Sequence, residues 1–177
     1  MDFASNYISN ALFEFQRYKS YGDHVFKQLS EEDFFWQLSP TDNNIALVIK
    51  HLAGNMLSRW TNFLTEDGEK SWRDRDNEFT DPPSSKEELM ELWEKGWNCL
   101  FNALGTINED NFETRIRIRN QTHTIPEAIN RQLAHYASHV GQLVLLGKMI
   151  KKEDWISPTI PKGQSNAFNQ KMFGKNS

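Results

Sequence analysis

The sequence contains a single cysteine, Cys99, among its 177 residues. One cysteine excludes an internal disulfide and is typical of a reducing compartment, so we expect a cytoplasmic protein. Because Cys99 lies in a helical pattern between Trp97 and Leu100, a small buried hydrophobe is the favoured interpretation, and a reactive thiol is the alternative.

Long apolar runs and basic runs are also missing. No stretch of 18 apolar residues occurs, so no membrane-spanning helix is predicted. The N-terminus, Met1-Asp2-Phe3, lacks a basic region ahead of an apolar one, so we expect no secretory signal. The net charge is −4, from 20 lysines and arginines against 24 aspartates and glutamates. We therefore expect neither nucleic acid nor a membrane as a main partner.

The composition and length instead indicate a globular protein. Hydrophobic residues make up 38% and aromatic residues 12% of the chain, which is typical of a folded domain. We predict one domain over residues 1–150 and a C-terminal tail over residues 151–177. The tail contains Trp155 and Phe168, so part of it is expected to pack on the domain.

Four segments show the apolar spacing of amphipathic helices, and the predicted fold class is all-α. A short helix is expected after the first of them, where Ser30 precedes three acidic residues. The last long helix begins with a capping box formed by Thr124 and Glu127, with Pro126 at the first helical position. The four long helices are expected at residues 3–29, 44–64, 84–104 and 124–150.

Two segments interrupt this helical pattern. Residues 66–84 are charged and contain a glycine and two prolines, so they predict a long loop, and long loops in compact domains are often functional. Residues 114–125 place Ile116 and Ile118 between arginines. This alternation predicts a short β-hairpin with its turn at Asn120-Gln121, and an irregular loop is the alternative.

Two histidines, His135 and His139, lie four residues apart in the last predicted helix, next to its apolar stripe. Side chains at this spacing lie one above the other, about 5–6 Å apart at Cβ. A third histidine, His51, lies in a polar stripe of the second predicted helix. Because helices of a bundle can face each other across such stripes, the three imidazoles are predicted to meet at one metal ion.

Neutral imidazole binds zinc, nickel, copper and iron, and three protein ligands leave coordination positions open, as in catalytic sites. We therefore predict a site for one divalent ion, with zinc or nickel best suited. Asn55, Gln132 and Gln142 are candidates for orienting the ligands or binding substrate. The alternative is that each histidine only forms hydrogen bonds beside the core. His123 is either a fourth ligand or a solvated strand residue, and His24 is interpreted as structural.

Arginines and tryptophans lie near the end of the second predicted helix and in the predicted long loop. Because arginine binds carboxylates with two parallel hydrogen bonds, these residues are candidates for binding an acidic, thiol-bearing cosubstrate. The alternative is a surface salt-bridge network with aromatic packing. No general base or other catalytic residue can be named from the sequence. The candidates are Arg59, Trp60, Trp72, Arg73 and Arg75.

The histidines lie in two motifs, IKHLAGN at residues 49–55 and RQLAHYASHVGQ at residues 131–142. Through these motifs the chain resembles, over nearly its whole length, the DinB-like superfamily of four-helix-bundle metalloproteins, the YfiT-like group. Residues 68–76 and 160–165 are similar to a poorly characterised branch of it. The resemblance implies an up-and-down bundle with a right-handed, noncanonical connection, and it implies a homodimer.

The resemblance also implies a nickel, zinc or similar ion on one histidine of the second helix and two of the fourth, which match His51, His135 and His139. Some characterised relatives attach low-molecular-weight thiols to substrates. Our first hypothesis is therefore a metal-dependent thiol transferase acting on small electrophiles. A second hypothesis is a non-catalytic metal-binding or stress-related dimeric bundle, and a third is a metal-dependent hydrolase.

Overall fold

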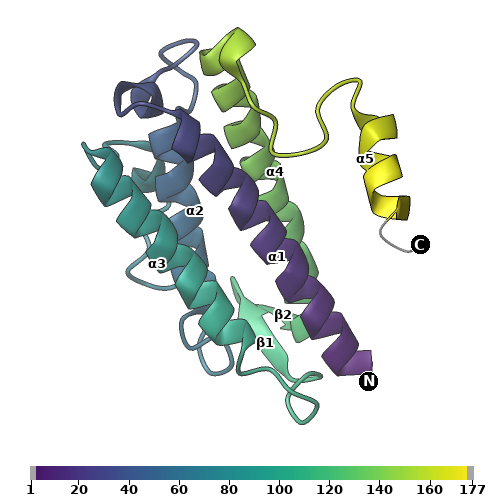
Figure 1. Cartoon of the computed structure of the whole chain (residues 1–177). Coiled ribbons are helices and arrows are strands. Elements are labelled where there is room, and N and C mark those ends of the chain that lie inside the picture. Colours follow the sequence, from purple (N-terminus) through teal and green to yellow (C-terminus); the bar gives the residue numbers. More distant parts are fainter. Residues whose placement is uncertain (1–2, 175–177) are drawn as a thin grey trace.

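The computed structural model describes residues 3–174, and within that range the chain forms five α-helices and one small antiparallel hairpin (Figure 1). The prediction of a mainly helical chain with a hairpin before the last long helix is confirmed. None of the helices in this range has the length and apolar character needed to cross a bilayer. The helices are α1 (Phe3–Gln28), α2 (Ile45–Trp60), α3 (Lys86–Leu104), α4 (Ile125–Lys151) and the short α5 (Ser165–Phe173).

Side-chain caps define where three of the long helices begin. The side chain of Asn44 accepts a hydrogen bond from the backbone N–H of the third residue of α2. Capping boxes start α3, with Ser85 and Glu88, and α4, with Thr124 and Glu127. Each cap satisfies backbone N–H groups that have no partner within the helix, and this explains why the sequence predicted these starts closely.

The four long helices pack together, with α1 beside α4 and α3, and α2 beside α3 and α4. Helices α1 and α4 run in the same direction, since Tyr7 contacts Pro126 near their starts and Val25 lies beside Gly147 near their ends. Helices α2 and α3 also run in the same direction, because Ala53 lies against Gly96 and, further along both helices, Thr61 is 3.5 Å from Cys99. Helices α2 and α3, which follow each other in the chain, are therefore parallel, and the up-and-down order implied by the resemblance does not hold at this connection.

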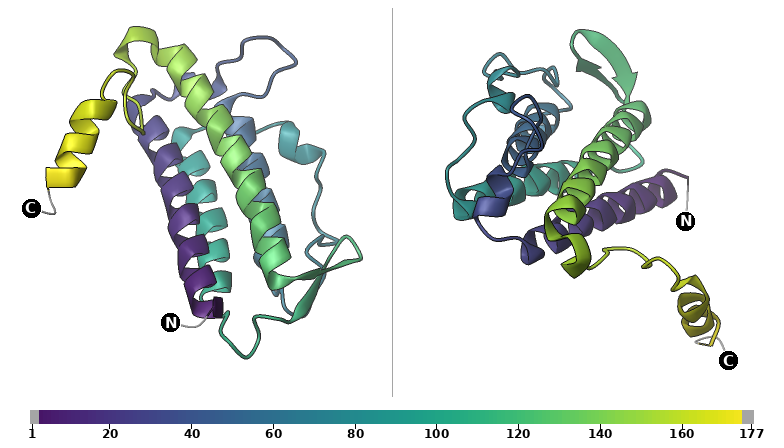
Figure 2. Two further views of the ribbon diagram at one scale, coloured as in Figure 1. Left: turned by 90° about the vertical axis from the view of Figure 1, so that its right-hand side faces the viewer. Right: turned by 90° about the horizontal axis from the view of Figure 1, so that it is seen from above.

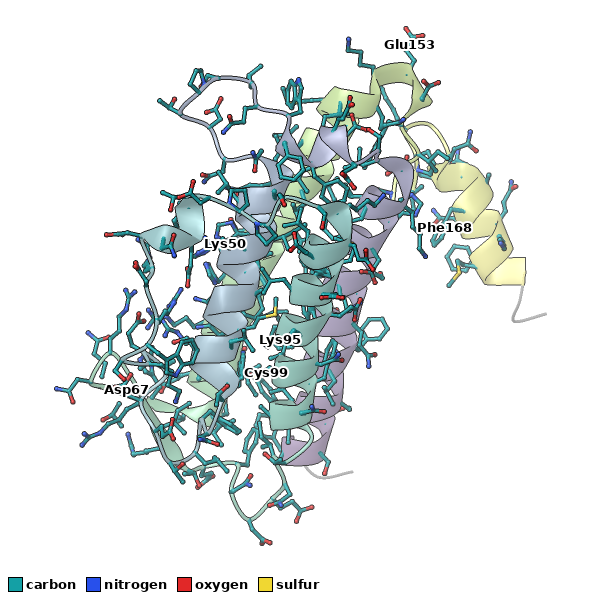
Figure 3. The ribbon with its side chains drawn as sticks, turned by 90° about the vertical axis from the view of Figure 1, so that its left-hand side faces the viewer. Lys50, Asp67, Lys95, Cys99, Glu153 and Phe168 are labelled. Atoms are coloured by element: carbon teal, nitrogen blue, oxygen red, sulfur yellow. The ribbon has the colours of Figure 1, made fainter. Side chains whose placement is uncertain are left out.

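The reason is the long segment between α2 and α3, residues 61–85, here called the crossover loop. The loop starts at the hairpin end of the molecule, where Gly68 N–H donates to the carbonyl of Arg117. It returns to the opposite end, where Lys50 Nζ donates to the carbonyl of Asn77 at 2.6 Å. Figure 3 shows Asp67 and Lys50 at these two levels of the molecule. The chain thus restarts α3 at the end where α2 began.

Helix α2 ends four residues earlier than predicted, at Trp60 instead of residue 64. Asn62 has a φ of 47°, in the left-handed region, which stops the helix and turns the chain into the crossover loop. Within that loop, Asn77–Phe79 forms a single 3-10 turn, η2. A second 3-10 turn, η1 (Glu32–Phe35), is the short helix predicted after the first long one.

The hairpin consists of β1 (Arg115–Ile118) and β2 (Gln121–Thr124), with Ile118 opposite Gln121. Its turn is formed by Arg119 and Asn120, both with positive φ (54° and 59°). Two such residues fit the tight turn that matches the twist of a two-stranded ribbon. The turn therefore lies one residue earlier than predicted.

The tail is attached to the helices at its beginning. The 3-10 turn η3 (Lys152–Asp154) leads to Trp155, which packs against the core. The backbone N–H and C=O of Ile156 are both hydrogen-bonded to the side chain of Gln28 on α1. Helix α5 lies apart from the four long helices in every view (Figure 2).

Close packing of α2 on α3 depends on Gly96. A Cβ atom built at Gly96 would lie 2.9 Å from the Cα of Ala53. We predict that Gly96→Ala lowers the free energy of unfolding by about 1–3 kcal/mol, because the overpacked helices must separate. Urea denaturation measures this difference.

Gly141→Ala is the matched control, since no atom lies within 4 Å of a Cβ built there. It should leave the free energy of unfolding unchanged or raise it by up to about 1 kcal/mol. Equal effects of the two variants would contradict the packing argument.

Candidate metal centre

Three histidine side chains converge on one point between α2 and α4. His51 of α2 lies opposite His135 and His139, which are one turn apart on α4. The Nε2 atom of His135 lies 3.2 Å from Nε2 of His51 and 3.1 Å from Nε2 of His139. The three imidazoles each point a ring nitrogen at the same small volume.

Hydrogen bonds on the far side of two rings fix their orientation. Nδ1 of His51 lies 2.8 Å from Oε2 of Glu78, and Nδ1 of His139 lies 2.8 Å from Oε1 of Gln142. Both acceptors are oxygens, so each Nδ1 donates its proton, and in the neutral ring the lone pair is then on Nε2. This arrangement of an oxygen acceptor behind a ligating histidine recurs at metal sites in proteins.

The geometry of the three rings, and the pKa values of His135 and His139, fit a divalent metal ion. Two nitrogens bound to one ion at about 2.0–2.1 Å lie about 3.3–3.4 Å apart at a tetrahedral angle, close to the separations here. Burial, together with the nearby His139 and His51, lowers the pKa of His135 to about 3. Burial also lowers the pKa of His139, opposed by its bond to Gln142. Both rings are therefore neutral at pH 7, which is the form that binds metal.

The acidic partner of His51, Glu78, was not predicted from the sequence. Glu78 lies in η2 of the crossover loop and is 5% exposed. Arg73 Nε also donates to its Oε1 at 2.7 Å. Burial alone would raise the pKa of Glu78, but the bonds from His51 and Arg73 outweigh it, so the pKa is lowered and the carboxylate is ionised. A buried carboxylate therefore ties the crossover loop to the histidine cluster.

Gly54 is a sequence signal that could have indicated the close approach of Glu78. It lies within α2, almost one turn after His51, and a Cβ there would be 2.5 Å from Oε1 of Glu78. A glycine inside a helix costs stability, so it commonly marks a close approach by another group. Here that group is the Glu78 carboxylate.

A second carboxylate, Glu69, joins several of the predicted arginines. Its Oε2 accepts from Arg59 at 2.9 Å, from Arg73 at 3.2 Å and from Arg119 at 3.1 Å. Arg59 also donates to the carbonyl of Gly68. Arg59 and Arg73 have side chains only 4% and 2% exposed, so they form an internal network rather than the surface network considered as an alternative.

A cavity of about 200 Å³ adjoins the histidine cluster on the side of this network. His51 and His135 form part of its wall, so an ion on the histidines would be reached from the cavity. Its lining contains five arginines and two amides, and no carboxylate among the described residues. The lining residues are His51, Asn55, Arg59, Arg73, Arg75, Arg119, Arg131, Gln132 and His135.

The structure brings most of the predicted residues to this place and leaves two of them out. Asn55 lines the cavity and accepts a hydrogen bond from the Tyr136 hydroxyl at 3.1 Å. Trp60 is buried in the core and donates to the same hydroxyl, away from the cavity. Trp72 is 59% exposed and does not line the cavity. Arg119 and Arg131, which do line it, were not predicted.

The remaining histidines lie outside the cluster. His123 is on β2, opposite Ile116, and its ring is not within the group of potential ligands. His24 Nε2 lies 3.1 Å from the carbonyl of Ile156, where it helps to hold the start of the tail. Of the two interpretations of His123, the structure thus disfavours the fourth ligand.

Comparison with known proteins gives one match. A protein family described as "Protein of unknown function (DUF1572)" matches residues 2–164, nearly the whole chain. This family is in the DinB-like superfamily, in agreement with the resemblance found in the histidine motifs. No curated protein and no solved structure matches the chain.

Proposed function

We infer the function from two facts: the chain belongs to the DUF1572 family of the DinB-like superfamily, and three of its histidines converge on one point. We propose that His51, His135 and His139 bind one divalent ion, zinc or nickel, and that the chain is a metal-dependent thiol transferase acting on small electrophiles. The proposal includes the four-helix bundle of the superfamily, with α1–α4 as its helices. The convergence of three Nε2 atoms beside an open cavity is the observation that carries it.

Each residue of the centre has a separate task in this proposal. The three Nε2 atoms are the ligands, and Glu78 and Gln142 hold two of the rings in the orientation that presents the lone pair. A divalent ion on three imidazoles keeps coordination positions open and lowers the pKa of a thiol or water that it binds. The arginines of the cavity provide positive charge for an acidic cosubstrate.

The lining of the cavity favours a thiol over water as the nucleophile. Among the described residues that line it, none is a carboxylate, and its two histidines are assigned as ligands. Attack by water is commonly assisted by a separate general base, such as a glutamate, which this cavity lacks. A thiol needs less help, because its ordinary pKa of about 8.5 is already close to neutral.

A conjugation assay tests the proposed reaction. Zinc- and nickel-loaded protein is mixed with glutathione, cysteine or coenzyme A and a general electrophile such as monobromobimane, at a pH where the uncatalysed reaction is slow. We expect acceleration by metal-loaded protein with at least one of the thiols, and none with protein stripped by a chelator. Metal binding without acceleration would rule out the thiol-transferase hypothesis and leave the alternative of a non-catalytic metal-binding protein. Turnover of ester substrates without any thiol would instead identify a hydrolase.

A further inference from the structure

The cavity beside the histidines carries more positive charge than the neighbouring carboxylates neutralise. Five arginines line it, whereas two carboxylates, Glu69 and Glu78, contact them. These carboxylates accept from Arg59, Arg73 and Arg119. The arginines therefore divide into a paired group and an unpaired group.

Arg59 and Arg73, two members of the paired group, bind partners within the protein. Arg73 binds both Glu78 oxygens, at 2.7 and 2.9 Å, and also reaches Glu69. Arg59 binds Glu69 and the carbonyl of Gly68. Both side chains are buried, so breaking these contacts for a ligand would leave buried charges without partners. We interpret Arg59 and Arg73 as the framework of the cavity.

The unpaired group consists of Arg75 and Arg131. Within residues 3–174, neither has a carboxylate oxygen within 4.0 Å. Arg75 comes from the crossover loop, with its guanidinium 5.6 Å from the centre of the Phe79 ring. Arg131 comes from α4, one turn before His135. Two free guanidinium groups thus reach one cavity from two separate elements.

A buried amide oxygen in the cavity also has no partner. Gln132 is 2% exposed and lines the cavity, and its side-chain oxygen Oε1 has no hydrogen-bond partner among the described residues. Nε of Arg59 is likewise buried and unpaired. Leaving such groups unsatisfied costs free energy, so their presence at a cavity points to a ligand that bonds with them. An amide oxygen requires a hydroxyl or amino donor.

We propose that this cavity binds a small carboxylate that also carries a hydroxyl or amino group. Arg75 and Arg131 bind the carboxylate, and Gln132 bonds with the hydroxyl or amino group. A volume of about 200 Å³ equals that of about seven water molecules, which fits a small carboxylate. The residues proposed to bind this carboxylate are arginines and an amide, so its binding does not depend on the metal. The inference rests on the proposed function only for the reaction that the bound carboxylate would then undergo at the metal.

Calorimetric titration of metal-free protein tests the proposal with two matched probes. Malate carries a hydroxyl group, and succinate is the same dicarboxylate without it. We expect saturable binding of both, with malate bound more tightly. Arg131→Gln and Arg75→Gln should each weaken malate binding about tenfold or more, since each removes a charge-assisted hydrogen-bond partner. Gln132→Leu should remove the preference for malate over succinate.

Arg117→Gln is the matched control, because Arg117 is exposed on β1 and does not line the cavity. An equal loss in this variant would show attraction by overall charge and overturn the proposal. So would the absence of saturable binding, or tighter binding of inorganic phosphate than of either dicarboxylate. Equal affinities for malate and succinate would overturn the role of Gln132. In His139→Ala, malate binding should persist although metal binding is lost, because His139 belongs to the histidine cluster but does not line the cavity. Failures of the two proposals are therefore distinguishable.

Discussion

Replacing His135 with alanine is expected to abolish stoichiometric metal binding. The Nε2 atom of His135 lies 3.2 Å from that of His51 and 3.1 Å from that of His139, so its loss leaves two ligands. Mutation of a residue that only hydrogen-bonds to a metal ligand typically lowers metal affinity 10- to 100-fold. Removal of the ligand itself should lower the affinity by more than this. Elemental analysis after gel filtration should show about one ion per chain in the wild type and almost none in the variant.

Circular dichroism separates this result from unfolding. Helical content should be retained in His135→Ala, because the ring is only half-buried and the core of α4 is formed by other residues. His123→Ala is the control and should keep its metal, since His123 lies outside the cluster. Full retention of metal in both His135→Ala and His139→Ala would mean that the ligands are misassigned.

Replacing Glu78 with alanine is expected to weaken both the fold and the metal site. The change leaves Arg73 buried without its main partner, which should lower the free energy of unfolding by about 3–5 kcal/mol. It also removes the acceptor behind His51, so metal affinity should fall about 10- to 100-fold. Urea denaturation and competition with a chromophoric chelator measure the two effects.

Two further variants sharpen this prediction. Glu78→Gln keeps the shape and one oxygen acceptor, so it should recover part of both losses. Glu91→Ala removes an exposed acidic residue of α3 that does not line the cavity, and both quantities should stay at their wild-type values. If folded Glu78→Ala bound metal as tightly as the wild type, Glu78 would not orient His51.

The long helices and the histidine cluster were predictable because their signals are local. Helix starts are encoded by capping residues such as Thr124 and Glu127, and the helix faces by apolar spacing. His135 and His139 share a helix face because of their spacing alone. The predicted bounds of their helix differ from the observed bounds by one residue at each end. The meeting with His51 followed from the polar stripe on α2.

The direction of α3 and the partner of His51 were not predictable in the same way. Both depend on the path of the crossover loop, which has no apolar period and is held by long-range contacts. One such contact joins Lys50 to the Asn77 carbonyl, and another joins Gly68 to the Arg117 carbonyl. Glu78 and Arg131 acquire their roles only once these contacts fix the loop beside α2 and the cavity forms. Trp60 is the opposite case, a residue that was predicted for the site but lies in the core.

Anomalous diffraction at the zinc or nickel absorption edge, from crystals of metal-loaded protein, tests the central proposal most directly. We predict one strong peak between α2 and α4, about 2.0–2.1 Å from the Nε2 atoms of His51, His135 and His139. A metal peak bound elsewhere, with this position empty in protein that elemental analysis shows to hold one ion per chain, would contradict it.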